Sequence, residues 1–274
     1  MPAAPHTRSS RRADLERLGL GTGDAVLVHA ALRSLGPILG GHDELIGALR
    51  DVLGPDGTLL AYTDWQGEDG ANAGASRESD LRPHLPPFDP LTSRATHDNG
   101  AFPELVRTTP GALRSGNPGA SMVALGGRAA WFVADHALDY GYGPQSPLGK
   151  LVEADGKTLL LGAPRDTMTL LHHAEHLAEI PGKRIRRYEA PLLVDGQTVW
   201  RWFEEFDTSD PVVEGLSDDY FADIVTAFLA SGAGSEGKVG NADCVLVEAR
   251  PVVRFAVDWL ERRSPGPRGS TGSP

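Results

Sequence analysis

The sequence predicts an α/β protein with a three-layer α/β/α fold, built as a single domain around a mixed sheet. Three observations support this prediction: apolar runs alternate with helical patterns, one strand pair is joined by a two-residue turn, and no linker-like stretch interrupts residues 11–263. Strands interleaved with helices are typical of a sheet covered on both faces, and the hairpin adds an antiparallel pair. We expect the Pro-, Gly- and Ser-rich tails 1–10 and 264–274 to be disordered.

The first half of the chain alternates helical and strand patterns. The turn residues Gly21 to Asp24 and the breaker Gly54 to Gly57 mark where buried strands begin. Asp43 is a suitable N-cap for a helix. These signals predict, in order, a short helix over Asp14–Leu18, a strand over Ala25–His29, a helix over Asp43–Leu53 and a strand over Thr58–Tyr62.

Residues 63–99 have no regular apolar period. Segments of this length without secondary structure inside a compact domain are usually functional or disordered. This one carries Trp65, Phe88 and many acidic residues, so we predict a substrate-binding loop.

The second half of the chain repeats the alternation and adds the hairpin. Asp195-Gly196 lies between two apolar runs and is the strongest short hairpin signal in the sequence. Pro181-Gly182 ends the helix before it. The expected elements are helices over Phe102–Thr108, Met168–Glu179, Asp218–Ala230 and Val252–Arg262, and strands over Ser121–Leu125, Thr158–Leu161, Arg184–Val194, Gln197–Phe206 and Cys244–Val247.

Composition and charge limit the functions that this chain can have. The formal net charge of -11 argues against a nucleic-acid partner, because phosphate binding needs a basic patch. An acidic chain suits a cationic small molecule, although acidity also serves solubility. No apolar run reaches the roughly 20 residues of a membrane span, and the N-terminus lacks the apolar segment of a secretory signal. The single cysteine, Cys244, excludes an internal disulfide, and we expect a cytoplasmic protein.

Three chemically active side chains share one face of the helix predicted over Met168–Glu179. His172, Glu175 and His176 are three and four residues apart, which makes them neighbours on a helix. A carboxylate beside an imidazole fixes the tautomer and raises the basicity, so His172 is a candidate general base. The alternative is a helix of ordinary packed histidines. His172 and His176 also have the spacing of zinc ligands, but no third ligand is evident and we expect no metal.

Acidic and aromatic residues gather at strand ends and in the long loop. Tyr62, Asp64 and Trp65 follow one strand, Asp89 lies in the loop, and Glu205 and Asp207 end the hairpin. Carboxylates with interleaved rings suit a polyamino sugar, although ordinary turn acids give a similar pattern. The small-residue loop 114–121 leads into a strand, and its amides and hydroxyls suit phosphates or a pantetheine amide.

A set of short motifs carries a resemblance in its order along the chain. The motifs are Gly23-Asp24, Val28 to Arg33, Gly36-Pro37, Tyr62 to Trp65, Pro87 to Pro90, Arg114-Ser115, Asn117-Pro118, Ala120 to Ala124, Ser146-Pro147, Leu160 to Pro164, Leu171-His172, Ala174-Glu175, Ile180-Pro181, Lys183-Arg184 and Glu189 to Pro191. In this order the chain resembles the antibiotic 3-N-acetyltransferase family over nearly its whole length between the tails. The resemblance implies acetyl transfer from acetyl-CoA to the 3-amino group of a 2-deoxystreptamine aminoglycoside, an activity that confers antibiotic resistance.

The resemblance also implies roles for individual residues. His172 is implied as the catalytic base, and Glu205 as its partner or as a carboxylate that binds the amine. We expect the substrate to be bound by Tyr62, Asp64, Trp65, Asp89, Glu175, Asp207 and Glu214. Contacts with acetyl-CoA are implied for Ala30, Ala31, Leu32, Arg33, Ser34, Ser115, Asn117 and Ser121. The chain departs from the family pattern at Asn117, where histidine is common, and over residues 208–214.

We expect direct attack of the amine on the thioester, because no activated Ser or Cys is apparent. Glu205 or Glu175 would orient the His172 imidazole, and backbone amides near Ala30 or Ser115 would stabilise the oxyanion. The alternatives are an acetyltransferase of the same fold acting on another amine, a zinc hydrolase, and a binding protein that sequesters cationic drugs. The prediction is compatible with a homodimer.

Overall fold

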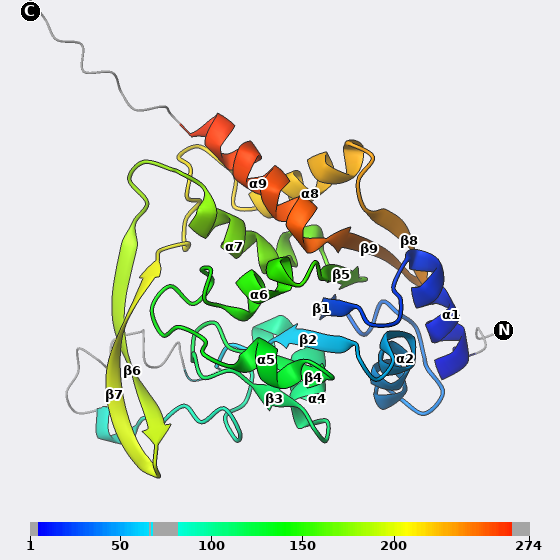
Figure 1. The fold of residues 1–274 in the computed structure, drawn as a ribbon, viewed down its shortest axis with the longest axis horizontal. Helices are drawn as coiled ribbons and strands as arrows, with labels where there is room; N and C mark the ends of the chain where they lie inside the picture. Colours follow the sequence, from blue (N-terminus) through cyan, green and yellow to red (C-terminus); the bar gives the residue numbers. More distant parts are fainter. Residues whose placement is uncertain (1–4, 66, 68–81, 265–274) are drawn as a thin grey trace, which may run out of the picture.

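The computed structural model describes residues 5–65, 67 and 82–264. Among these residues, seven strands form one mixed sheet in the order β3-β4-β2-β1-β5-β9-β8 (Figure 1). At its centre, β1 (Ala25–Ala30) pairs in parallel with β2 (Thr58–Tyr62) and β5 (Lys157–Leu161). The other pairs are antiparallel and involve β3 (Leu113–Arg114), β4 (Met122–Gly126), β8 (Ser235–Val239) and β9 (Ala242–Glu248).

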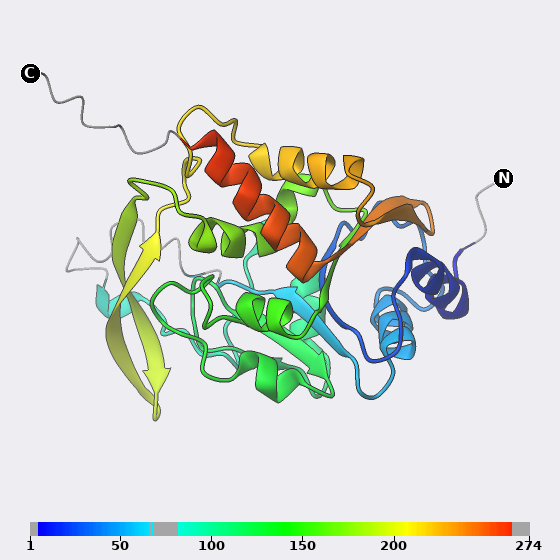
Figure 2. The ribbon, with the colours of Figure 1, turned by 45° about the horizontal axis from the view of Figure 1, so that its top comes forward.

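Both faces of this sheet are apolar and covered by helices, because successive residues of a strand point to opposite faces. On β1, Leu27 belongs to the core under one helix layer, whereas Val26 and Val28 belong to the core under the other. The first layer contains α5 (Ala129–Val133), α6 (Pro147–Glu153), α7 (Leu170–Leu177), α8 (Tyr220–Ala230) and α9 (Ala249–Arg263). The second contains α1 (Arg8–Leu18), α2 (Asp43–Leu53) and α4 (Phe102–Thr108). The predicted three-layer α/β/α fold is confirmed (Figure 2).

The predicted hairpin forms a two-stranded sheet of its own, outside the main sheet. Its strands are β6 (Ile185–Val194) and β7 (Gln197–Phe206). Asp195 and Gly196 have φ values of 50° and 77°, and two positive φ angles are what a type I′ hairpin turn requires. The hairpin packs on Trp65 and Phe88 through a separate apolar cluster, at the end of the molecule opposite α1 (Figure 1).

The N-terminal helix begins earlier than predicted. Thr7 and Ser10 form a capping box at the start of α1, so residues 8–10 belong to a helix and not to a disordered tail. The basic and polar residues of this segment conceal its helical period, because α1 buries only Arg11, Leu15 and Leu18. Residues 1–4 and 265–274, which were also assigned to the tails, lie outside the described residues.

Four short elements were missed by the sequence analysis, namely α5, α6, β3 and β8. They are too short to establish an apolar period, and β8 is a mostly exposed, polar edge strand. Part of the predicted substrate loop contains short 3₁₀ helices at Arg82–His84 and His97–Asn99. Within the described part of the chain, no helix has both the length and the apolarity that crossing a membrane requires.

Candidate active site

A cavity of about 390 Å³ lies at the carboxyl ends of the three parallel strands. Loops that leave neighbouring parallel strands on opposite faces of a sheet leave a crevice at this edge, where α/β proteins commonly bind ligands. His29 and Ala30 come from β1, Tyr62 from β2, and His172 and Phe221 from the helices above. The fold therefore brings the predicted base to the wall of a cavity.

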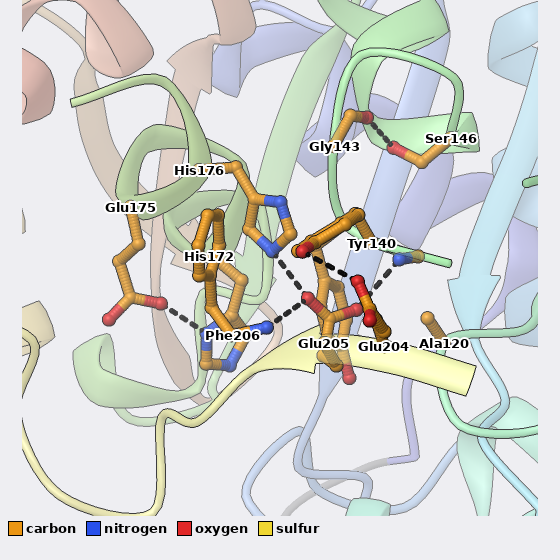
Figure 3. A network of polar contacts seen from close by, with 12 residues as sticks. Ala120, Tyr140, Gly143, Ser146, His172, Glu175, His176, Glu204, Glu205 and Phe206 are labelled. Carbon is orange, nitrogen blue, oxygen red and sulfur yellow. Dashed lines mark hydrogen bonds and ion pairs between the residues drawn. The ribbon is translucent and has the colours of Figure 1, made fainter. Parts of the chain in front are cut away.

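A buried carboxylate holds the His172 imidazole. Nδ1 of His172 lies 2.6 Å from Oε2 of Glu175, one helical turn away on α7 (Figure 3). Glu175 is fully buried, and its Oε1 accepts a hydrogen bond from the Tyr220 hydroxyl of α8. A carboxylate on Nδ1 keeps the proton on that nitrogen and makes Nε2 the basic atom. The side chain of His172 is 28% exposed, so the imidazole lies between the buried pair and the cavity.

Glu205 contacts the other histidine of this helix face. Its Oε1 lies 2.8 Å from Nε2 of His176, although the two groups are not aligned as a hydrogen bond (Figure 3). The Glu205 carboxylate also accepts hydrogen bonds from the amides of Gly141 at 2.7 Å and Phe206 at 2.8 Å. Glu175, and not Glu205, is therefore the carboxylate that orients His172. Of the two carboxylates predicted to orient the imidazole, Glu175 contacts His172, whereas Glu205 remains a candidate carboxylate for binding the amine.

A second cavity, of about 290 Å³, lies between the end of the hairpin and the first cavity. Tyr62 lines both cavities, whereas Tyr142, Glu205 and Asp207 line the second. Hydrogen bonds from Ser209 lower the pKa of Asp207, so its carboxylate is charged at neutral pH. The second cavity thus offers two carboxylates, together with one cation, Arg186.

Several predicted substrate residues have structural roles instead. Trp65 is 5% exposed and packs on Phe88, with 5.9 Å between the ring centroids. Asp89 accepts hydrogen bonds from Leu91 and Thr92 within its own turn. Glu175 is too deeply buried to meet a substrate. The fold itself uses all three side chains. For Trp65 and Asp89 the reason is that acids and aromatic rings in a long loop also serve to fold that loop.

The remaining two predicted substrate acids are not at the second cavity. Asp64 is half-buried and accepts a hydrogen bond from the side chain of Asn99, which lines the first cavity. Glu214 is exposed and lines neither cavity. Asp64 therefore contacts a residue that lines the first cavity without lining it itself, and Glu214 lies outside both cavities.

The predicted acetyl-CoA residues divide into two groups. Ala30 and Ala31 line the first cavity, whereas Leu32, Arg33 and Ser34 continue the turn and do not. In the second loop, Ser115, Asn117 and Ser121 are at most 2% exposed and form internal hydrogen bonds with Met122, Gly119, Ala137 and Thr63. Their polar atoms brace the protein interior, so the predicted ligand contacts of these three residues are corrected.

Two of the backbone amides near Ala30 and Ser115, where we expected an oxyanion to be stabilised, are engaged in the fold. The Ala31 amide donates to Leu161 O at 3.1 Å, and the Ser115 amide donates to Met122 O at 2.9 Å. Neither amide is available to a ligand, because each has a partner in the fold.

The sequence analysis missed His29, whose ring lines the first cavity. Burial lowers the pKa of His29 to about 4, so the ring is neutral at physiological pH. Its buried Nε2 has no hydrogen-bond partner among the described residues. The sequence does contain a signal for His29, because it directly follows the apolar run Ala25 to Val28. A polar residue at the carboxyl end of a buried parallel strand commonly faces a binding crevice.

His136 is a second buried histidine, and it makes stability depend on pH. Nε2 donates to Gly141 O at 2.7 Å, so Nδ1 accepts from the Ser115 hydroxyl at 2.8 Å. Burial lowers the pKa of His136 to about 4 from 6.5. Between these values the unfolded chain binds a proton that the folded protein excludes, so stability falls as the pH decreases through this window.

We expect this histidine to contribute about 3 kcal/mol to the loss of stability between pH 6.5 and pH 4. Urea denaturation at several pH values in this window measures the loss. His136→Gln is expected to reduce it by this amount, while His29, whose pKa burial also lowers to about 4, keeps part of the pH dependence. His42→Gln is the control, because His42 is exposed. Equal pH dependence in wild type and His136→Gln would contradict the assignment.

A metal centre finds no support among the described residues. No three His, Cys, Asp or Glu side chains of this part of the chain are grouped as metal ligands. His172 and His176, the proposed zinc pair, contact separate carboxylates.

Comparison with known proteins identifies the family. Residues 27–261 match the family model of the aminoglycoside 3-N-acetyltransferases. The chain is 47% identical to aminoglycoside N(3)-acetyltransferase III of Pseudomonas aeruginosa over 263 residues, which cover 94% of this chain and 95% of the relative.

Two solved structures support this result. One is AAC-IIIb in a binary complex with CoASH, with a TM-score of 0.92, 58% identity, and coverage of 99% of this chain and 100% of the other. The second is sisomicin-bound AAC-VIa, with a TM-score of 0.90, 35% identity, and coverage of 96% and 100%. The predicted resemblance is confirmed, and the chain is an enzyme of the aminoglycoside 3-N-acetyltransferase family.

Proposed function

We propose that the protein transfers the acetyl group of acetyl-CoA to the 3-amino group of a 2-deoxystreptamine aminoglycoside, with His172 as general base. Family membership supports the reaction, and the relatives bound to CoASH and to sisomicin support the two substrates. The observation that carries the mechanism is the His172–Glu175 pair, with 2.6 Å between Nδ1 and Oε2, at the wall of a cavity.

The two cavities suit the two substrates. The first receives the thioester end of acetyl-CoA, because Ala30 and Ala31 line it and His29 offers a buried polar atom that has no partner among the residues the structure describes. The second receives the aminoglycoside, because Glu205 and Asp207 attract ammonium groups. His172 lines the first cavity, and its ring contacts Tyr142 of the second, so the base lies where the substrates meet.

An aminoglycoside amine is mostly protonated at neutral pH, so it first releases one proton to solvent. The reaction needs a base for the second proton, which the neutral amine loses as it attacks. His172 Nε2 takes the proton that the amine loses as its nitrogen bonds to the carbonyl carbon. The same imidazolium then gives this proton to the sulfur as the carbon–sulfur bond breaks. Glu175 stabilises the imidazolium between these events, and the Tyr220 hydroxyl holds Glu175 in place.

The test is thiol release from acetyl-CoA in the presence of gentamicin, neomycin, apramycin or a simple polyamine. We expect turnover with at least one aminoglycoside, and the mass of the product identifies the acetylated amine. Turnover with the simple polyamine alone would favour a same-fold acetyltransferase of another amine. Release of no thiol with any of these amines would refute the proposal.

We expect Asp207→Asn to raise KM for the aminoglycoside about fivefold, because it removes a partly screened charge interaction of about 1 kcal/mol. KM for acetyl-CoA should not change. Steady-state kinetics with each substrate varied in turn make this comparison, and the KM increase should shrink at high salt. Asp210→Asn is the matched control, because Asp210 lies in the same segment but its side chain is 78% exposed. An equal effect of both substitutions would contradict a specific contact.

A further inference from the structure

The His172 imidazole lies between two aromatic rings that the reaction described above does not use. The Tyr142 ring centroid is 4.9 Å from that of His172, with 38° between the planes. The Phe221 ring centroid is also 4.9 Å away, at 63°. Tyr142 comes from the loop between α5 and α6, and Phe221 comes from α8. Two distant segments therefore converge on the same imidazole.

The Tyr142 ring is held firmly in this position. Its hydroxyl lies 2.6 Å from the Tyr62 hydroxyl and donates to Gly119 O at 3.1 Å. The Tyr142 carbonyl accepts a hydrogen bond from Nδ1 of His173, the neighbour of His172 on α7, at 2.8 Å. Tyr142 thus forms hydrogen bonds both with α7, the helix that carries the base, and with Gly119 at the wall of the second cavity.

The same loop is fastened on its other side. The Tyr140 amide donates to Glu204 O at 2.7 Å, and the Gly143 amide donates to Tyr140 O at 2.8 Å. Figure 3 shows Tyr140 and Gly143 near His172 and His176 of α7. The Tyr142 ring is therefore fixed relative to His172 by hydrogen bonds of its hydroxyl, its carbonyl and its flanking residues.

Aromatic rings at this distance do more than fill space. The face of an aromatic ring attracts a cation within about 6 Å of its centroid, and the attraction grows where water is excluded. His172 is neutral before proton transfer and cationic after it. Ring contacts therefore stabilise the protonated base more than the neutral base, which lowers the barrier to proton transfer.

We propose that Tyr142 is a positioning residue that, together with Phe221, clamps the His172 imidazole and stabilises its protonated form during acetyl transfer. The proposal rests on the proposed role of His172 as the base. Other titratable groups also surround His172, namely Glu175 on Nδ1, and Tyr62, His29, Asp98 and Asp166 around the first cavity. The experiment must therefore separate the Tyr142 ring from these groups and from the hydroxyl of Tyr142 itself.

The experiment compares Tyr142→Phe with Tyr142→Leu at saturating acetyl-CoA and aminoglycoside. The first variant keeps the ring and removes the hydroxyl, whereas the second removes both. We expect Tyr142→Leu to lower kcat roughly tenfold and Tyr142→Phe to stay within about twofold of wild type. KM for acetyl-CoA should not change, because Tyr142 does not line the first cavity. Tyr62→Phe is the control for loss of the hydroxyl pair.

Two results would overturn the proposal. The first is wild-type kcat in Tyr142→Leu, and the second is an equal loss in Tyr142→Phe, which would assign the effect to the hydroxyl. Thermal denaturation checks that the variants fold. If Tyr142→Leu does not fold, Phe221→Leu removes the other ring that contacts His172 and provides the same test. Failure of the proposed function is distinguishable, because the wild-type enzyme would then acetylate no aminoglycoside.

Discussion

The His172→Ala variant is expected to lose kcat by a factor of about 100 to 10,000, the usual contribution of a general base. Without the imidazole, solvent must accept the proton of the attacking amine, and no other described histidine is held on a carboxylate at the wall of the first cavity. Thiol release at saturating substrates measures this loss. The fold should survive, because His172 is partly exposed and contributes little to the core.

The control for this variant is His42→Ala, which replaces an exposed histidine at the start of α2 and should keep wild-type turnover. Thermal denaturation of both variants excludes a folding defect. Wild-type kcat in His172→Ala would remove this residue from the mechanism. The Tyr142 proposal would then fail as well, because it depends on a cationic intermediate at His172.

The second large effect is expected for Glu175→Gln, which should lower kcat about 100-fold or more. Glutamine keeps the shape of the side chain but removes the negative charge that stabilises the imidazolium. In an unrelated catalytic triad, the corresponding acid-to-amide change costs a factor of about 10,000. Glu205→Gln is the matched comparison, because Glu205 contacts His176 and not the base. We expect a clearly smaller loss of kcat in that variant.

Glu175 is also expected to contribute to the stability of the fold. Glu175→Ala should lower the free energy of unfolding by about 1–3 kcal/mol, because the buried Tyr220 hydroxyl loses its acceptor. Urea denaturation provides this value, and Glu175→Gln should be affected less. If Glu205→Gln impaired kcat as strongly as Glu175→Gln, Glu175 would not be the only carboxylate that supports the base.

Local rules were sufficient wherever the determining residues are close in sequence. The His172–Glu175 contact follows from residues three apart on a helix, and the hairpin turn follows from Asp195-Gly196. The central strands were also predictable, because their apolar runs are buried on both faces. The sequence by itself therefore determined the fold class and the family, and it supplied His172 as the candidate base with two possible carboxylates.

Only the tertiary structure decided how distant polar groups are paired. Ser121 was predicted to meet a ligand, but its hydroxyl donates to Thr63 O at 2.6 Å, a partner that lies on another strand end. Glu205 was one of two carboxylates predicted to orient His172, but the packing of the hairpin brings it to His176. The sequence around a loop side chain does not indicate which distant group it will contact after folding. A polar group that becomes buried must nevertheless form a hydrogen bond with some partner.

The same reason explains why the surroundings of the base were invisible in the sequence. Tyr142 and Phe221 both contact His172, although they lie in separate segments of the chain. No sequence motif around either residue predicts this contact. The sequence predicted the candidate base and its neighbouring carboxylate, because helix geometry is local. The tertiary structure decided what surrounds that residue, because packing joins segments whose separation along the chain contains no information about their distance in space.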